Sequence, residues 1–134
     1  MLRYFILPVA TAALLGVAAA PTFAHHAFVM FDKNKEVTLT GTVKEFENTN
    51  PHAEITLSVP KDGKTVDWII QTESPIVLEQ KGIDDSTLTK GEKITARVHP
   101  LKDGKPGASL VELKTEDGMV MSLGAKAYGE LMKN

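Results

Sequence analysis

Hydrophobic and polar residues alternate in short stretches from Lys35 onward, and turn residues separate these stretches. Such alternation is typical of strands with one buried face, so it predicts an antiparallel β domain. Two Asp-Gly pairs, at 62–63 and 117–118, indicate tight hairpins. The predicted strands cover residues 37–43, 53–59, 66–72, 94–98, 111–115 and 119–123.

The pattern changes its period once, between the third and fourth strands. Ser74 followed by Pro75 is a favourable helix start and Gly82 a favourable stop, so a helix of about two turns is predicted over 75–81. Residues 124–134 are predicted to form a short tail helix. Three apolar residues are expected to pack the first helix onto the sheet: Ile76, Val77 and Leu78.

Three strands, a short helix and two or three further strands follow the order of a small OB-like antiparallel barrel. In that fold the helix between strands three and four plugs one end, and a small open β-sandwich is the alternative. Gly41, in the middle of the first strand, predicts a bulge or sharp bend that lets one long strand serve both halves of the barrel. The predicted core consists of Ile55, Leu57, Val66, Trp68, Ile70, Ile94, Val98 and Leu113.

The first 24 residues have the features of a removable export signal. Arg3 provides the positive start, residues 5–20 form the apolar run, and Thr22 and Ala24 are small residues at positions −3 and −1 of a cleavage site. The run is short for a bilayer span. We therefore expect cleavage after Ala24, a mature chain that begins at His25 with no membrane span, and a periplasmic or secreted location.

Composition limits the remaining function classes. After removal of the signal 110 residues remain, which is enough for one domain, 25–134, with one core. The formal net charge is −2, and loss of Arg3 with the signal makes it −3. Lysines and glutamates are interspersed without a basic cluster, which predicts that nucleic acid is not a partner. Cysteine is absent, so disulfides, thiolate ligands and a thiol nucleophile are excluded.

The candidate chemistry lies in four histidines, which all follow the signal: His25, His26, His52 and His99. A mature terminus at His25 offers an α-amine and an imidazole from one residue, a chelate that favours Cu(II). His52 and His99 each adjoin a proline at a strand end, and either would complete a three-nitrogen site. Thioethers that could serve Cu(I) are Met30, Met119 and Met121. The sequence thus predicts a module that binds a transition metal, copper above all, through these histidines.

A different class of function fits the same residues. Histidines at strand ends or at a chain terminus are commonly solvated surface residues, and the rival hypothesis is a metal-free structural or protein-interaction module of the cell envelope. The expected partner is accordingly a metal ion or an envelope protein. The run 32–36 begins like a calcium loop, but Val37 occupies the position that needs glycine. A phosphate-binding loop and a nucleophile elbow are both missing, so an enzyme is not expected and a hydrolase has the least support.

Four blocks of sequence resemble a family of small exported bacterial proteins of unknown function. The blocks are His25–Asp32, Val37–Phe46, Thr49–Ala53 and His99–Gly104. The resemblance covers nearly the whole mature chain, and the family pattern includes all four histidines, but it implies no activity. Where that family commonly has an aromatic residue, this chain has Glu54, which argues against an aromatic ligand surface on the second strand.

Overall fold

The computed structural model describes residues 29–123. The helix predicted over 124–134 therefore lies outside the described residues. The described elements, in chain order, are β1 (Val37–Glu47), β2 (Glu54–Lys61), β3 (Lys64–Gln71), α2 (Pro75–Gln80), β4 (Lys93–Pro100), β5 (Gly107–Thr115) and β6 (Val120–Ser122). This order of elements is the one predicted from the alternation of hydrophobic and polar residues.

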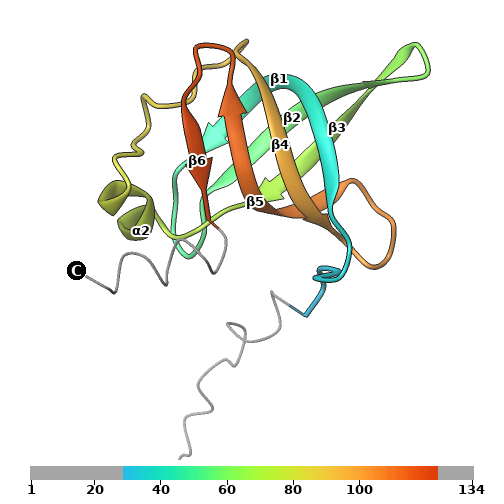
Figure 1. The fold of residues 1–134 in the computed structure, drawn as a ribbon, viewed down its shortest axis with the longest axis horizontal. Helices are drawn as coiled ribbons and strands as arrows, with labels where there is room; N and C mark the ends of the chain where they lie inside the picture. The colour runs from blue at the N-terminus through green and yellow to red at the C-terminus, as the bar shows by residue number, and fades with distance from the viewer. Residues whose placement is uncertain (1–28, 124–134) are drawn as a thin grey trace, which may run out of the picture.

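The strands form one sheet that closes on itself. Its order is β3-β2-β1-β4-β5-β6, with antiparallel neighbours throughout, and a parallel pairing of β3 with β5 completes a five-stranded barrel. The short strand β6 continues on the edge of β5, from Lys114 to Glu112 (Figure 1). The OB-like barrel is thus confirmed, with the helix between β3 and β4, and the open-sandwich alternative is wrong.

The barrel interior holds the side chains that alternate inward on the five strands. Six of the eight predicted core residues are fully buried: Ile55, Leu57, Ile70, Ile94, Val98 and Leu113. The other two predictions, Val66 and Trp68, are wrong in degree, because both side chains are only half-buried. Trp68 packs against the edge of the core. It lies on the part of β3 that pairs with β2 only, because the pairing of β3 with β5 begins one residue later, at Ile69.

Strand β1 serves both halves of the barrel, as predicted, but its bulge lies at another position than Gly41. It pairs with β4 from Val37 to Thr42 and with β2 from Thr42 to Glu47. The irregularity in register lies between Val43 and Glu45, so the bulge predicted at Gly41 is wrong by three positions. Gly41 instead permits close packing, since a Cβ atom there would lie 2.4 Å from the carbonyl oxygen of Ser58.

The helix α2 begins at the predicted proline and ends one residue earlier than expected. Its residue Leu78 is fully buried, whereas Ile76 is 65% exposed, so the expectation that Ile76 packs onto the sheet is wrong. A helix of six residues presents only a narrow face to the barrel, and that face is centred on Leu78. Within residues 29–123 no helix combines the length and apolar character needed to cross a membrane.

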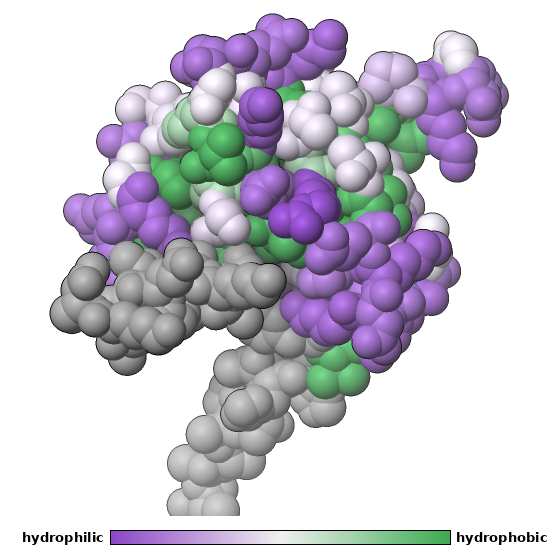
Figure 2. All heavy atoms as spheres, in the orientation of Figure 1, coloured by the Kyte–Doolittle hydropathy of each residue, from purple (hydrophilic) through white to green (hydrophobic). Residues whose placement is uncertain are grey.

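The hairpin between β2 and β3 extends beyond the barrel. Pairing of β2 with β1 stops at Ser58, whereas β2 and β3 continue as partners to Lys61 and Lys64 (Figure 1). Asp62 and Gly63 form the turn with φ angles of 52° and 74°, the left-handed conformation that the predicted Asp-Gly hairpin requires. The tip is exposed and hydrophilic (Figure 2).

Candidate functional site

His99 lies at the end of β4 and faces outward. Its neighbours Val98 and Pro100 are buried in the barrel, so the imidazole is on the opposite face of the strand, where it is half-buried. The ring nitrogen Nδ1 is 2.9 Å from the backbone carbonyl oxygen of Lys35. Because a carbonyl oxygen can only accept, Nδ1 carries the proton in this contact, and the neutral ring has its lone pair on Nε2.

The segment before β1 is joined to the chain next to His99. The amide of Asp32 donates to the carbonyl of Pro100 at 2.8 Å, and the amide of Lys102 donates to the carbonyl of Met30 at 2.9 Å. Phe31 forms a β-bridge with Leu101 between these two bonds and is only 4% exposed. The earliest described residues are thus fixed along the stretch that directly follows His99.

A tight turn holds the carbonyl group that contacts the imidazole. The amide of Lys35 donates to the carbonyl of Asp32 at 3.1 Å, and the amide of Asn34 donates to Oδ1 of Asp32 at the same distance. Asp32 is therefore bonded both to Pro100 at the end of β4 and to the turn that contains Lys35. These bonds hold the carbonyl of Lys35 in place. Within residues 29–123, the imidazole of His99 is thus oriented by a backbone group, the carbonyl of Lys35.

His52 lies in a different part of the barrel. It belongs to the connection between β1 and β2, next to Ala53, which is fully buried. The amide of Ala53 donates to the carbonyl of Glu73, and the amide of Thr72 donates to the carbonyl of Ala53. The pairing of Glu54 with Gln71, of Gln71 with Ser109 and of Ser109 with His99 places strands β3 and β5 between the two histidines. Neighbouring strands are about 4.8 Å apart, whereas ligands of one metal ion must lie within a few ångströms of each other.

The structure consequently separates the predicted site residues into three groups. The strand pairings put β3 and β5 between His52 and His99, and the prediction that one or the other is the partner of His25 and His26 stays a prediction. His25 and His26 lie outside the described residues. Across residues 29–123 no three histidine, aspartate or glutamate side chains converge in a way that could hold a metal ion. Among the predicted thioether ligands Met30 is exposed, Met119 is half-buried against the core, and Met121 is buried in it.

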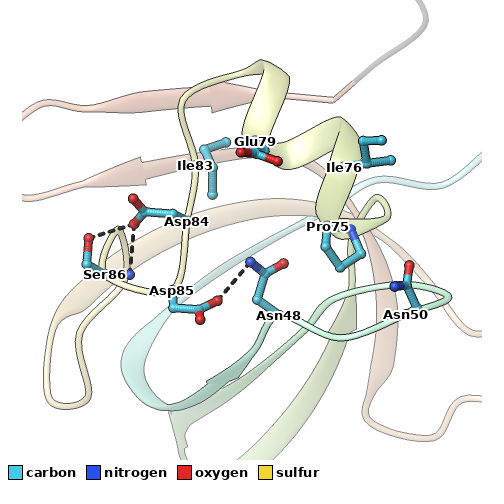
Figure 3. Close-up of a pocket in the computed structure, with 9 residues that line it drawn as sticks. All are labelled: Asn48, Asn50, Pro75, Ile76, Glu79, Ile83, Asp84, Asp85 and Ser86. Atoms are coloured by element: carbon cyan, nitrogen blue, oxygen red, sulfur yellow. Dashed lines mark hydrogen bonds between the residues drawn. The ribbon is translucent and has the colours of Figure 1, made fainter.

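A cavity that the sequence did not reveal lies between α2 and the connection from β1 to β2. It measures about 640 Å³, and α2, residues 83–86 and the start of the β1–β2 connection form its walls (Figure 3). Asn48 donates from Nδ2 to Oδ1 of Asp85 at 2.9 Å. The side-chain amide oxygen of Asn48, Oδ1, is buried without a hydrogen-bond partner. The two residues are 37 positions apart, so no local sequence signal joins them.

The wall formed by residues 83–86 is fixed by hydrogen bonds within its own loop. Asp84 accepts from the hydroxyl of Ser86 at 2.6 Å, from the amide of Ser86 at 2.9 Å and from the hydroxyl of Thr87 at 3.3 Å. The hydrogen bond from the Ser86 hydroxyl has the largest effect and the one from the Ser86 amide the next largest, and both lower the pKa of Asp84 below the ordinary value of 3.8. Asp84 is therefore ionised at neutral pH.

A family model shows to which protein family the chain belongs. A model of DUF6152, a family of unknown function, matches residues 13–109, which is more than half of the sequence and includes all four histidines. The chain belongs to the DUF6152 family. This agrees with the resemblance seen in the four sequence blocks, and the family description adds no activity. A search of the curated proteins finds no match.

One similar solved structure is the mitochondrial single-stranded DNA binding protein Rim1 of S. cerevisiae. It shares 11% identity, and the alignment covers 67% of this chain and 96% of that chain with a TM-score of 0.46. This finding contradicts the prediction that excluded nucleic acid as a partner, because the matched protein binds single-stranded DNA. The likeness concerns the fold alone, and the DNA binding of the matched protein is not carried over to this chain.

Proposed function

We propose that this DUF6152 protein is an exported periplasmic binding module that holds a transition metal, copper above all, through His25, His26 and His99. The observation that carries the proposal is the hydrogen bond from His99 Nδ1 to the carbonyl oxygen of Lys35. Metal-binding histidines usually donate their second ring nitrogen to a carbonyl or carboxylate in this way, which fixes the ring and leaves the other nitrogen for the metal.

The course of the described N-terminal segment supports the choice of His99 over His52. Met30 is bonded to Lys102, three residues beyond His99, so it lies roughly 10 Å along the chain from the imidazole. His25 precedes Met30 by five residues, which span at most about 17 Å when extended. The mature terminus is thus long enough to return to His99. The strand pairings place β5 and β3 between this segment and His52.

The proposed donor set consists of the α-amine and imidazole of His25 with the imidazoles of His26 and His99. Nitrogen ligands of this kind follow the divalent affinity series, which peaks at Cu(II). Binding in the order Cu(II) above Ni(II) and Zn(II) is therefore expected. Because amine and imidazole must lose their protons to bind, the affinity should decrease as the solution is acidified.

The decisive experiment uses protein purified from the periplasm with its natural terminus, which terminal sequencing must show to be His25. Copper titration by calorimetry then compares the wild type with His99→Ala and with His52→Ala. We expect His99→Ala to weaken Cu(II) binding about tenfold or more and His52→Ala to leave it unchanged. A third protein with one residue added before His25 should also bind more weakly, because the α-amine no longer belongs to the chelate.

Equal copper affinity in the wild type and the His99→Ala variant would remove His99 from the site. If cells that produce only the variant with all four histidines replaced by alanine have the same cell-envelope phenotype as cells with the wild type, copper binding is not the function of this protein. The chain would then be better described as a metal-free structural or protein-interaction module. Metal analysis of the freshly purified protein distinguishes copper from another transition metal.

A further inference from the structure

Ser109 is an outward-facing residue of the barrel that is nevertheless buried. Its neighbours on β5, Ala108 and Leu110, belong to the core, so the side chain of Ser109 is on the outer face of the strand. It is only 6% exposed, and its hydroxyl oxygen Oγ has no hydrogen-bond partner among residues 29–123. A buried hydroxyl without a partner is unfavourable for folding, so its presence calls for an explanation.

The strand pairing places Ser109 directly opposite His99. The two residues are partners in the antiparallel pairing of β5 with β4, and directly opposite residues have their side chains on the same face of the sheet. The Cβ atoms of such a pair are about 4.5–5.5 Å apart. On its other side Ser109 pairs with Gln71 of β3. The hydroxyl therefore lies where the barrel closes, between the side chains of two neighbouring strands.

The hydrogen bond of His99 turns its second ring nitrogen towards the side on which Ser109 lies. Strand β4 is between β1 and β5 in the sheet. Nδ1 of His99 contacts the carbonyl of Lys35, which precedes β1 and so belongs to the β1 side. The two nitrogens of an imidazole are on opposite sides of the ring. The lone pair of Nε2 is therefore directed away from β1, towards the side of β5 and Ser109.

The donors of the proposed metal site leave the charge of the ion uncompensated. The α-amine and the imidazoles all bind as neutral groups, so a divalent ion keeps its full positive charge. Arg97 lies two residues before His99, on the same face of β4. It pairs with Glu36 at 3.2 Å and with Glu112 at 3.5 Å, so both of these carboxylates are already engaged. A small anion from solution is the group that compensates the metal ion.

The hydroxyl of Ser109 is suited to this anion rather than to the metal ion itself. Copper and zinc favour imidazole, thiolate and carboxylate ligands over a neutral hydroxyl group. Oγ of Ser109 is one bond beyond Cβ, whereas Nε2 of His99 is at the far end of its ring, so an ion on Nε2 lies farther from the sheet than the hydroxyl. A metal–nitrogen bond is about 2.0 Å long and a hydrogen bond from a hydroxyl about 2.8 Å. An anion on the metal ion fills the interval between them.

We propose that Ser109 holds a small anion on the metal ion that His25, His26 and His99 bind. The inference rests on the proposed metal site and extends it, because one coordination position is then open to a ligand from solution. That ligand is an anion that bonds the metal through one oxygen or nitrogen atom and accepts a hydrogen bond from the Ser109 hydroxyl. The same bond gives the buried hydroxyl a partner.

The test uses the mature protein with its natural terminus, loaded with Cu(II), and sodium azide as the probe anion. Azide bound to Cu(II) gives a charge-transfer absorption, and its titration measures the affinity. Ser109→Ala removes the donor, so this variant should bind Cu(II) as tightly as the wild type and azide about tenfold more weakly. Ser122→Ala is the matched control and should bind azide like the wild type. Ser122 is exposed on β6, and its backbone carbonyl, not its hydroxyl, accepts from Lys81.

A purely structural role of Ser109 leads to a different expectation, which the metal-free protein can reveal. Ser109→Ala should not lower the free energy of unfolding, because the hydroxyl that it removes has no partner within the described part of the chain. Urea denaturation without copper measures this and shows that the variant is folded. A loss of stability combined with unchanged azide affinity would identify Ser109 as a structural residue only.

Three other results would overturn the inference. Equal azide affinity in the wild type and in Ser109→Ala would mean that the hydroxyl does not contact the anion. Absence of the azide absorption in the copper-loaded wild type would mean that no coordination position is open. Copper affinity reduced in Ser109→Ala as much as in His99→Ala would make Ser109 a metal ligand. A wild type that binds no copper removes the metal site and this inference together, whereas copper binding with any of these three results removes this inference alone.

Discussion

Gly41 lies so close to Ser58 that a side chain has no space between them. An added Cβ atom would be 2.4 Å from the carbonyl oxygen of Ser58 and 3.1 Å from Cγ of Leu57. This contact occurs where β1 changes partners, since Thr42 is the last residue paired with β4 and the first paired with β2. The absence of a side chain therefore allows one strand to belong to both halves of the barrel.

Gly41→Ala should destabilise the protein by about 1–3 kcal/mol, because the new methyl group meets backbone that cannot move alone. Gly107→Ala is a matched comparison: its Cβ would lie 2.5 Å from Cδ1 of Leu101, the end of a flexible side chain. We expect that variant to lose less than about 1 kcal/mol. Urea denaturation measures both free energies of unfolding. Equal losses would mean that Leu101 is as immobile as the backbone of Ser58.

Trp68→Ala should lose less stability than its size implies. Replacement of a fully buried tryptophan by alanine typically costs about 3–5 kcal/mol, but Trp68 is half-buried at the margin of the core, so we expect a loss below about 3 kcal/mol. Leu57→Ala, at the fully buried position paired with Trp68, should lose about 2–5 kcal/mol. A larger loss for Trp68→Ala than for Leu57→Ala would contradict the burial seen here.

The imidazole of His99 should populate one neutral tautomer. Donation from Nδ1 to the Lys35 carbonyl requires the proton on Nδ1, the less common site for a free neutral histidine. Long-range ¹H–¹⁵N correlation spectra above pH 8 should therefore show a protonated Nδ1 and an unprotonated Nε2 for His99. Asp32→Ala, which removes the side-chain bond to Asn34, should weaken this preference. A dominant Nε2 proton in the wild type would exclude the contact.

Asp84 should contribute to the acid sensitivity of folding. Hydrogen bonds from Ser86 hold the pKa of Asp84 below 3.8 in the folded protein, so the carboxylate adds stability above that pH. That contribution is lost as the pH falls through the lower folded value. Asp84→Asn should thus be less stable than the wild type at pH 7, with a difference that shrinks below about pH 3.8.

Ser86→Ala offers a direct check of the cause. Removal of the Ser86 hydroxyl should raise the pKa of Asp84 towards 3.8, which a ¹³C titration of the carboxyl signal can follow. An unchanged titration curve would assign the lowered pKa to other groups. The remaining backbone and Thr87 bonds should keep the loop folded in this variant.

The fold was predictable because its signals are local. Alternation of side chains marks the strands, the Asp62-Gly63 pair fixes a two-residue hairpin, and Ser74-Pro75 begins the helix at the right place. The errors arose where packing between distant segments decides the outcome. Gly41 could be recognised as special in the sequence, but the reason, the close approach of the Ser58 backbone, appears only once β2 is paired with β1.

The candidate site was predictable to a smaller extent. The residue type and strand-end position of His99 were correctly recognised, but sequence order gives no measure of how strands β3 and β5 separate it from His52. In the sequence the acidic residues are only interspersed with lysines, so nothing in it indicated a cavity. Their relation to Asn48 depends on the approach of two connections that are far apart along the chain.

The projecting β2–β3 hairpin exposes both of its edges, which raises the question of how the protein avoids joining other copies of itself. Beyond Ser58 these two strands have only each other as partners within the described residues. Pro60 lacks an amide donor, and lysines at 61 and 64 place positive charges at the tip, all of which discourage a further strand from adding. The β2–β3 hairpin is therefore protected against edge-to-edge aggregation. Loss of Pro60 or of those lysines would leave strand edges to which another chain could pair.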